Sequence, residues 1–285
     1  MTAATMTRPA TRAGRLARPD GASLYFESTG TGPALLFAHG LGGNHLSWWQ
    51  QIPHFADKFT CISFAHRGFA PSTCASGAPD PQDYADDAIA LLDHLEIEQA
   101  VFVCQSMGGW TGVESALAHP RRLAGLVLAS TTGSLSFDGF DDPEIAQWRE
   151  RGPQLRAQLV KDGVHPATGA VFAGESSGLH HLYAMIDRLN LGLDKETVRE
   201  RIWEMRRRGS EDAARIACPT LLLTGEDDIV IAPPGVRAVA RHIPDARVHS
   251  IPATGHSVYF ERAGLFNALL AGFLAEIGWG SGANP

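Results

Sequence analysis

Short apolar runs bounded by turn residues recur along the first half of the chain and predict a sheet. Four of them are Ala34–Ala38, Cys61–Phe64, Ala100–Cys104 and Leu123–Ala129. Because such runs are apolar on both faces, we interpret them as buried parallel strands. Tyr84–Leu95 sets apolar residues against acidic ones, which is typical of an amphipathic crossover helix. The alternation predicts an α/β fold with a mostly parallel, twisted sheet flanked by helices.

Both ends of the chain extend this pattern. Residues Gly14–Ser28 alternate around the turn signal Pro19-Asp20-Gly21, which predicts a β-hairpin at the sheet edge. Late in the chain the strand pattern returns with Thr220–Thr224 and Arg247–Ile251. A final apolar helix is expected over Gly264–Ile277.

Between the predicted strands Leu123–Ala129 and Thr220–Thr224 the pattern changes. The intervening segment is rich in Arg, Glu and Leu at helical spacing, as in Glu144–Leu159 and Lys195–Arg208, which predicts an inserted helical cap. A chain of 285 residues suits one domain with such an insertion. The expected organisation is a disordered tail over 1–13, a core domain over 14–134 and 216–285, and a cap over 135–215.

The composition limits the classes of binding partner. The net charge is −7, the pI is near 5.9, and no dense Lys/Arg stripe is present. This balance argues against nucleic acid and against anionic membrane surfaces, and it favours a small-molecule substrate. The oligomeric state stays open, a homo-oligomer included.

The sequence also bears on location. No apolar run approaches the roughly 18 residues of a membrane span, so we expect a soluble chain. Four arginines without an acid in residues 1–19 resemble a transit peptide in composition, but the apolar stretch of a secretory signal is missing, and a disordered tail is the simpler interpretation. The cysteines lack CxxC spacing and suit a reducing cytoplasm. They are Cys61, Cys74, Cys104 and Cys218.

The strongest chemical signal is a serine directly after a strand. The run from Val101 leads into Cys104-Gln-Ser106-Met-Gly108, and a helix is expected over Trp110–His119. A tight strand-to-helix turn strains Ser106 and exposes its hydroxyl, while small neighbours let helix and strand approach closely. This resembles the nucleophile elbow of α/β-hydrolases, with Cys104 in place of the usual glycine.

Three further segments resemble the same family. His39-Gly40-Leu41-Gly42-Gly43 is similar to its oxyanion loop, which implies that the N–H groups of Leu41 and Met107 stabilise a developing oxyanion and that His39 is structural.

Gly225-Glu226-Asp227-Asp228 resembles the family's Gly-x-x-Asp, which implies Asp228 as the orienting acid, with Glu226 and Asp227 as fallbacks. His256 follows Gly255 where the family carries its Gly-His, which implies that it is the general base. The order Ser, Asp, His matches this fold.

The resemblance covers residues 22–132 and 216–278, not the cap. It has one marked departure. Where the family commonly reads Asp-x-Arg-Gly-x-Gly-x-Ser, this chain reads Ala65-His-Arg-Gly-Phe-Ala-Pro-Ser72. The loop lies near the oxyanion wall in the family, so substrates of close relatives are a weak guide here.

Pocket residues follow from placing the cap over the carboxyl ends of the strands. They are mostly apolar and favour a small hydrophobic or aromatic acyl group. Adjacent His180 and His181 would point apart on a helix and have no carboxylate or cysteine at ligand spacing, so we predict no metal and no cofactor. The candidate lining is Leu41, Asn44, Trp48, Met107, Trp110 and Val258, faced by the segment His180–Tyr183 with His181 and Tyr183.

The predicted activity is hydrolysis of a small carboxylic ester or lactone through an acyl-enzyme on Ser106. Carbon–carbon bond hydrolases use the same triad, but they typically carry a Gly-Pro-Gly-like stretch and a Trp where this chain has Gly42-Gly43 and Ser257. A cofactor-free dioxygenase on this fold, whose histidine deprotonates a hydroxylated heteroaromatic, is a second alternative. A non-catalytic ligand receptor that retains the triad is a third.

Overall fold

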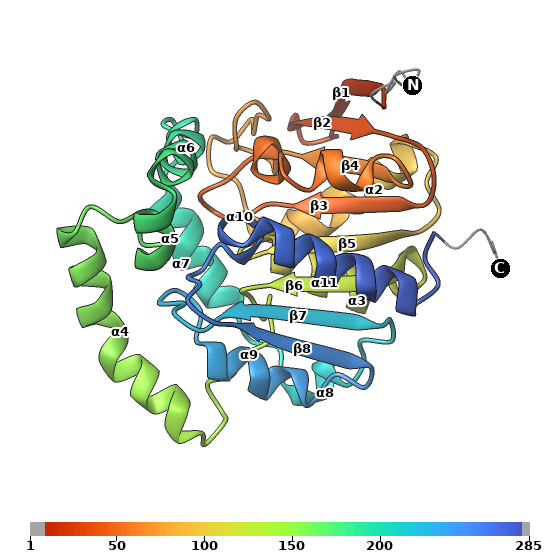
Figure 1. The fold of residues 1–285 in the computed structure, drawn as a ribbon. Helices are drawn as coiled ribbons and strands as arrows, with labels where there is room; N and C mark the ends of the chain where they lie inside the picture. Colours follow the sequence, from red (N-terminus) through yellow and green to blue (C-terminus); the bar gives the residue numbers. More distant parts are fainter. Residues whose placement is uncertain (1–8, 281–285) are drawn as a thin grey trace, which may run out of the picture.

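The computed structural model describes residues 9–280, in which eight strands form one twisted sheet with helices on both faces (Figure 1). Across the sheet the order is β1-β2-β4-β3-β5-β6-β7-β8. The pairs β1–β2 and β2–β4 are antiparallel and all other pairs are parallel. The predicted α/β fold is therefore confirmed. The strands are β1 Thr11–Ala17, β2 Ser23–Thr29, β3 Ala34–Ala38, β4 Thr60–Phe64, β5 Ala100–Gln105, β6 Leu123–Ala129, β7 Thr220–Gly225 and β8 Ala246–Ile251.

Alternate residues of the central strands enter two separate apolar layers. Leu36 and Phe102 belong to the core beneath α2, α3 and α9, whereas Leu35 and Val101 belong to the core beneath α1, α10 and α11. Burial on both faces explains why these strands read as continuous apolar runs. The helices of the two layers are α1 Ile52–Phe55, α2 Tyr84–His94, α3 Gly108–Ala118, α9 Pro233–Ala240, α10 Val258–Glu261 and α11 Ala263–Glu276.

An inserted helical segment separates β6 from β7, as the change of pattern predicted. In Figure 1 helices α4, α5, α6 and α7 lie together at one end of the sheet, with α4 outermost, whereas α8 lies apart from them. Among the residues of α4, only Ile145 and Gly152 are buried. The inserted helices are α4 Pro143–Lys161, α5 Ala170–Glu175, α6 Ser177–Arg188, α7 Lys195–Met205 and α8 Ser210–Ala213, and the short 3-10 helices of the chain are η1 His45–Trp48, η2 Pro81–Asp83 and η3 Pro120–Arg122.

Two boundaries differ from the sequence prediction. Strand β1 begins at Thr11, so the predicted tail over 1–13 is wrong for its last three residues, which pair with β2; residues 1–8 lie outside the described range. Helix α7 ends at Met205 instead of Arg208, because Arg208 leaves the helix to exchange backbone hydrogen bonds with Ser134 and Ser136. Within 9–280, no helix has the length and hydropathy of a bilayer span.

Candidate active site

Ser106 occupies the turn between β5 and α3. Its φ of +50° lies in the left-handed region, which non-glycine residues rarely adopt, and such strain is typical of a serine held at a strand-to-helix turn. A Cβ on the next-but-one residue, Gly108, would come within 2.3 Å of the Ala38 carbonyl oxygen. Glycine is therefore needed there for α3 to start against β3.

Cys104 replaces the usual glycine of this turn, and the structure shows what accommodates it. A Cβ at Gly112, one turn into α3, would lie 2.7 Å from the Cys104 sulfur. The missing side chain at position 112 leaves room for the thiol. Burial raises the pKa of Cys104, so the sulfur stays a neutral, inert thiol.

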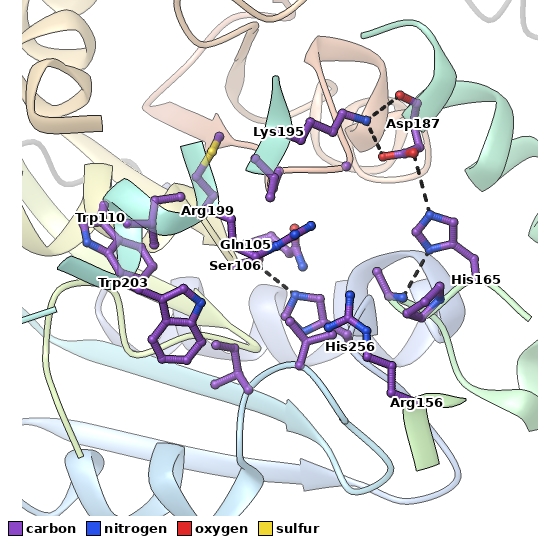
Figure 2. A pocket seen from close by; sticks show the side chains of 18 of the residues that line it. Gln105, Ser106, Trp110, Arg156, His165, Asp187, Lys195, Arg199, Trp203 and His256 are labelled. Atoms are coloured by element: carbon purple, nitrogen blue, oxygen red, sulfur yellow. Dashed lines mark hydrogen bonds and ion pairs between the residues drawn. The ribbon is translucent and has the colours of Figure 1, made fainter. Parts of the chain in front are cut away.

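His256 bridges Ser106 and Asp228. Its Nε2 lies 2.8 Å from Ser106 Oγ (Figure 2), and its Nδ1 lies 2.8 Å from Asp228 Oδ2. His256 is 3% exposed and Asp228 1%, so bulk water has little access to this relay. The arrangement suits a neutral imidazole that donates from Nδ1 and accepts the serine proton at Nε2.

Asp228 is fixed by backbone donors. Its Oδ1 accepts the N–H groups of Val230 at 2.7 Å and Ile231 at 3.0 Å, which leaves Oδ2 for the histidine. The fallback acids Glu226 and Asp227 are exposed. The structure thus brings Asp228 to His256, and the two fallback acids point to solvent.

Glu261 holds the backbone on both sides of the histidine. Its carboxylate accepts the N–H of Gly255 at 2.8 Å and the N–H of Ser257 at 3.0 Å, and also that of Gly169 in the cap at 3.0 Å. Burial raises the pKa of this carboxyl, while the three donors oppose the shift. Glu261 has no role predicted from the sequence; its spacing of five residues from His256 is the only signal the sequence offers.

The two predicted oxyanion donors lie at the same cavity wall. Leu41 and Met107 both line the cavity beside Ser106. Among the described residues, neither backbone N–H donates to another group of the chain. Two free amides beside a strained serine are what a tetrahedral oxyanion requires.

His39 lies outside the relay. Its ring is buried, and its Nε2 accepts the backbone N–H of His66 at 2.9 Å. His66 in turn lies 2.9 Å from the Thr111 hydroxyl on α3 through its own Nε2. Burial lowers the pKa of His39 to about 3 and that of His66 well below its usual value, so both rings are neutral near pH 7.

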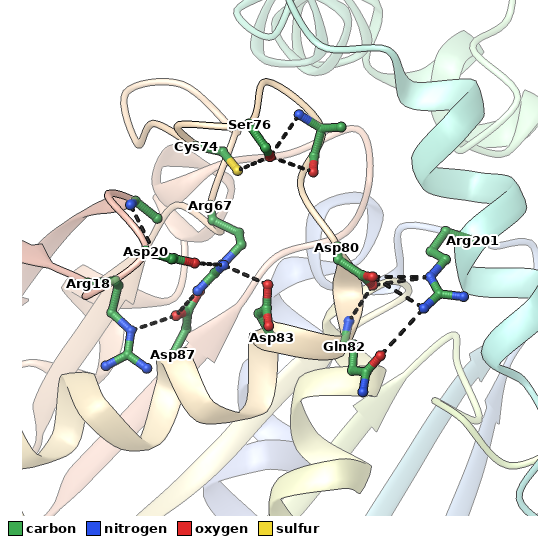
Figure 3. Close-up of polar contacts among 12 residues, drawn as sticks. Arg18, Asp20, Arg67, Cys74, Ser76, Asp80, Gln82, Asp83, Asp87 and Arg201 are labelled. Atoms are coloured by element: carbon green, nitrogen blue, oxygen red, sulfur yellow. Dashed lines mark hydrogen bonds and ion pairs between the residues drawn. The ribbon is translucent and has the colours of Figure 1, made fainter.

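The loop Ala65–Ser72, whose sequence departs from the family pattern, is anchored by a buried arginine. Arg67 contacts Asp87 with two nitrogens at 2.7 and 2.6 Å, and it also pairs with Asp83 and Asp20 (Figure 3). Such a bidentate pair fixes orientation as well as position. The loop is therefore held in a defined shape without the usual aspartate and second glycine.

A cavity of about 300 Å³ opens beside Ser106. Of the predicted lining, Trp110 and Tyr183 contribute to it together with Leu41 and Met107. Its lining is Leu41, Gly42, Gln105, Ser106, Met107, Trp110, Arg156, His165, Pro166, Ala167, Tyr183, Asp187, Lys195, Arg199, Ile202, Trp203, Arg206, Val230, Ile231 and His256.

Four predicted lining residues do not reach this cavity. Trp48 is buried among aromatic rings, with its ring centroid 4.5 Å from that of Tyr259, and Val258 is buried at the start of α10. Asn44 accepts the N–H of Leu46 and so caps η1. His181 is exposed, because it lies two residues from the buried Tyr183 on α6 and therefore on another side of that helix.

The predicted absence of metal stays a prediction. Within residues 9–280, no group of three His, Cys, Asp or Glu side chains is arranged to hold an ion. His180 instead accepts the N–H of His165 at 3.0 Å.

Comparison with known proteins relates this geometry to a family. Residues 35–269 match the alpha/beta hydrolase family. A 3-oxoadipate enol-lactonase from Acinetobacter baylyi is 38% identical over 130 residues, but that match covers only 46% of this chain and 44% of the lactonase.

Two relatives match over most of their length. A 2-hydroxymuconate semialdehyde hydrolase from Pseudomonas sp. (strain CF600) is 28% identical, over 87% of this chain and 89% of its own. The solved structure of Est816, described as an N-acyl homoserine lactone degrading enzyme, is 26% identical with a TM-score of 0.73, and the match covers 91% of this chain and 100% of that one. The three act on different compounds, so they do not determine a substrate.

Proposed function

This chain belongs to the alpha/beta hydrolase family, and we propose that it hydrolyses a small carboxylic ester or lactone through an acyl-enzyme on Ser106. The observation that carries the proposal is the relay from Ser106 Oγ through His256 to Asp228, with 2.8 Å at each step, at the wall of a cavity. The relative named as an enol-lactonase and the solved structure described as an N-acyl homoserine lactone degrading enzyme are consistent with it.

The chemistry follows from this relay. Ser106 Oγ attacks the carbonyl carbon while His256 Nε2 takes its proton, and the imidazolium is stabilised by Asp228. The N–H groups of Leu41 and Met107 bind the oxyanion, each worth about 2.7–4 kcal/mol in the transition state. His256 returns the proton to the leaving alkoxide, and water then cleaves the acyl-enzyme by the same steps.

Carbon–carbon bond hydrolysis is the second candidate, because the Pseudomonas relative is named as a hydrolase of a semialdehyde and matches most of this chain. This chain lacks the Gly-Pro-Gly-like stretch and the Trp after the catalytic histidine that are typical of such hydrolases, which counts against this candidate.

Labelling with a fluorophosphonate tests the nucleophile without knowledge of the substrate. We expect one covalent adduct by intact mass on the wild type and none on Ser106→Ala or His256→Ala. Ser130→Ala is the matched control, because Ser130 also has a φ of +50° after a strand, yet its buried hydroxyl has no hydrogen-bond partner. Wild-type protein that is folded but unlabelled would contradict the proposal. Labelled protein should then be assayed on short esters, lactones and a vinylogous diketone.

A further inference from the structure

The cavity beside Ser106 carries more positive than negative side chains. One acid, Asp187, faces four bases. The bases are Arg156, Lys195, Arg199 and Arg206, all from the inserted helical segment.

Two of these bases are neutralised within the protein. Lys195 Nζ lies 2.7 Å from the Asp187 carboxylate (Figure 2), and Arg199 pairs with Glu196 on the same helix. His165 also approaches Asp187, at 3.8 Å. Within residues 9–280, Arg156 and Arg206 make no ion pair, so the cavity keeps uncompensated positive charge.

Arg206 is the buried member of this pair. Its side chain is 6% exposed, and both Nε and Nη1 lack a hydrogen-bond partner. The guanidinium lies over aromatic rings, 4.4 Å from the centroid of Trp203 and 5.0 Å from that of Trp110. Burial lowers the pKa of Arg206 to about 10, which still leaves the group charged near pH 7.

A second unsatisfied donor accompanies it. The indole N–H of Trp110 is buried, has no acceptor and belongs to the same cavity wall. A buried donor without a partner lowers the free energy of unfolding, and a buried cation without a counter-ion lowers it further. Within residues 9–280, Asp138 raises the pKa of Arg206 at longer range but forms no ion pair with it, so a ligand is the available source of an anion in contact with the guanidinium.

We propose that Arg206 binds a carboxylate on the substrate, at the end remote from the bond that Ser106 attacks. A planar guanidinium matches a carboxylate geometrically, and one such group balances one negative charge. Figure 2 places Trp110 and Trp203 on one side of Ser106, so the substrate's carboxylate end would extend toward these rings. The inference rests on the proposed function and narrows its substrate to an anionic ester or lactone, where the sequence favoured an apolar one.

A matched pair of substrates tests this directly. The p-nitrophenyl monoester of adipic acid and p-nitrophenyl hexanoate have acyl chains of equal length and differ by a carboxylate against a methyl group. We expect wild type to prefer the anionic ester in kcat/KM. In Arg206→Met that preference should fall about 10- to 100-fold, the usual effect of losing a charged hydrogen bond, with hexanoate hydrolysis changed less than about threefold. The control is Arg207→Met, the adjacent exposed arginine, which does not line the cavity.

Each outcome decides the inference. A wild-type preference for hexanoate overturns it without any variant, and so does a preference that survives in folded Arg206→Met. Should Arg206→Met fail to fold, Arg206→Gln replaces it. Should neither ester react, fluorophosphonate labelling decides the hydrolase proposal, and calorimetry with adipate still tests the subsite. Adipate binding to Ser106→Ala that is lost in Ser106→Ala/Arg206→Met supports it, and absence of binding to Ser106→Ala overturns it.

Discussion

Replacing Glu261 with glutamine should lower kcat far more than it changes KM. The carboxylate accepts three backbone N–H groups, two of which flank His256. Glutamine keeps one oxygen and turns an NH₂ group toward at least one of those donors. A hydrogen bond to a charged acceptor is worth about 1.5–3 kcal/mol, so we expect the free energy of unfolding to fall by about 2–3 kcal/mol. Glu261→Ala would strand all three donors, a loss that approaches the whole stability of an ordinary domain, about 5–15 kcal/mol.

The catalytic effect comes from the position of the imidazole. Gly255 and Ser257 fix the backbone around His256, and a displacement of about 1 Å at a reacting group costs roughly 100-fold in rate. We expect Glu261→Gln to lower kcat on a p-nitrophenyl ester about 10- to 100-fold, with KM within about twofold of wild type, since the residue does not line the cavity. Fluorophosphonate labelling should slow in parallel.

Glu276→Gln is the control, because Glu276 is an exposed acid that pairs with Arg247 away from the site. Urea unfolding and steady-state kinetics on both variants separate the two roles. If Glu261→Gln loses stability but keeps its kcat, the residue only clamps the chain. If both quantities match wild type, the three hydrogen bonds carry no weight and the reasoning is wrong.

Three further changes test other parts of the structure. The pKa values of His39 and His66 are lowered in the folded protein, so below pH 6.5 the unfolded chain binds protons that the folded one does not. The free energy of unfolding should therefore fall by about 1.4 kcal/mol per pH unit for each histidine. His66→Gln should reduce that slope in urea titrations between pH 5 and 7. Gly112→Ala should cost about 1–3 kcal/mol, because its Cβ would lie 2.7 Å from both the Cys104 sulfur and Leu126 Cδ1. Adding Cys104→Ala should restore only part of this cost, measured as a double-mutant cycle, since the contact with Leu126 remains. Arg206→Met should raise the free energy of unfolding of the ligand-free protein by about 1–2 kcal/mol. The pKa of Arg206, lowered to about 10, implies that burying its charge costs about 3 kcal/mol below that pH, and the aromatic contacts offset part of this cost. A lower Tm of the variant would contradict this.

The strands and turns of the core domain could be predicted from local sequence patterns. The strand Ala34–Ala38 was predicted at its observed bounds because each of its residues is buried on one face or the other, so no periodicity had to be resolved. The turn at Ser106 was equally accessible, since its glycine at 108 is required by a backbone contact that any chain with this turn must make. Such features depend on neighbours in sequence.

The pocket depended on packing that no local pattern encodes. Trp48 looks like a lining residue because it follows the oxyanion loop, yet its ring packs at a tilt against Tyr259 and Phe266 from the last helices of the chain. Arg206 falls inside the predicted helical segment Lys195–Arg208, for which the sequence gives no sign of burial. The pairing of Arg208 with Ser134 and Ser136 ends the helix before that point, and Arg206 is buried.

The inserted segment acts on the relay as well as on the cavity. The indole of Trp148 donates to the Asp228 carbonyl at 2.7 Å, and Gly169 donates to the glutamate that fixes the histidine loop. Next to His256, the Ser257 hydroxyl lies 2.9 Å from the hydroxyl of Tyr183. The acid and the base are thus each tied to the cap, whereas Ser106 is held by the sheet and α3. Substitutions at these cap contacts should therefore lower kcat, unlike those at Arg206, which should act on the recognition of one class of substrate.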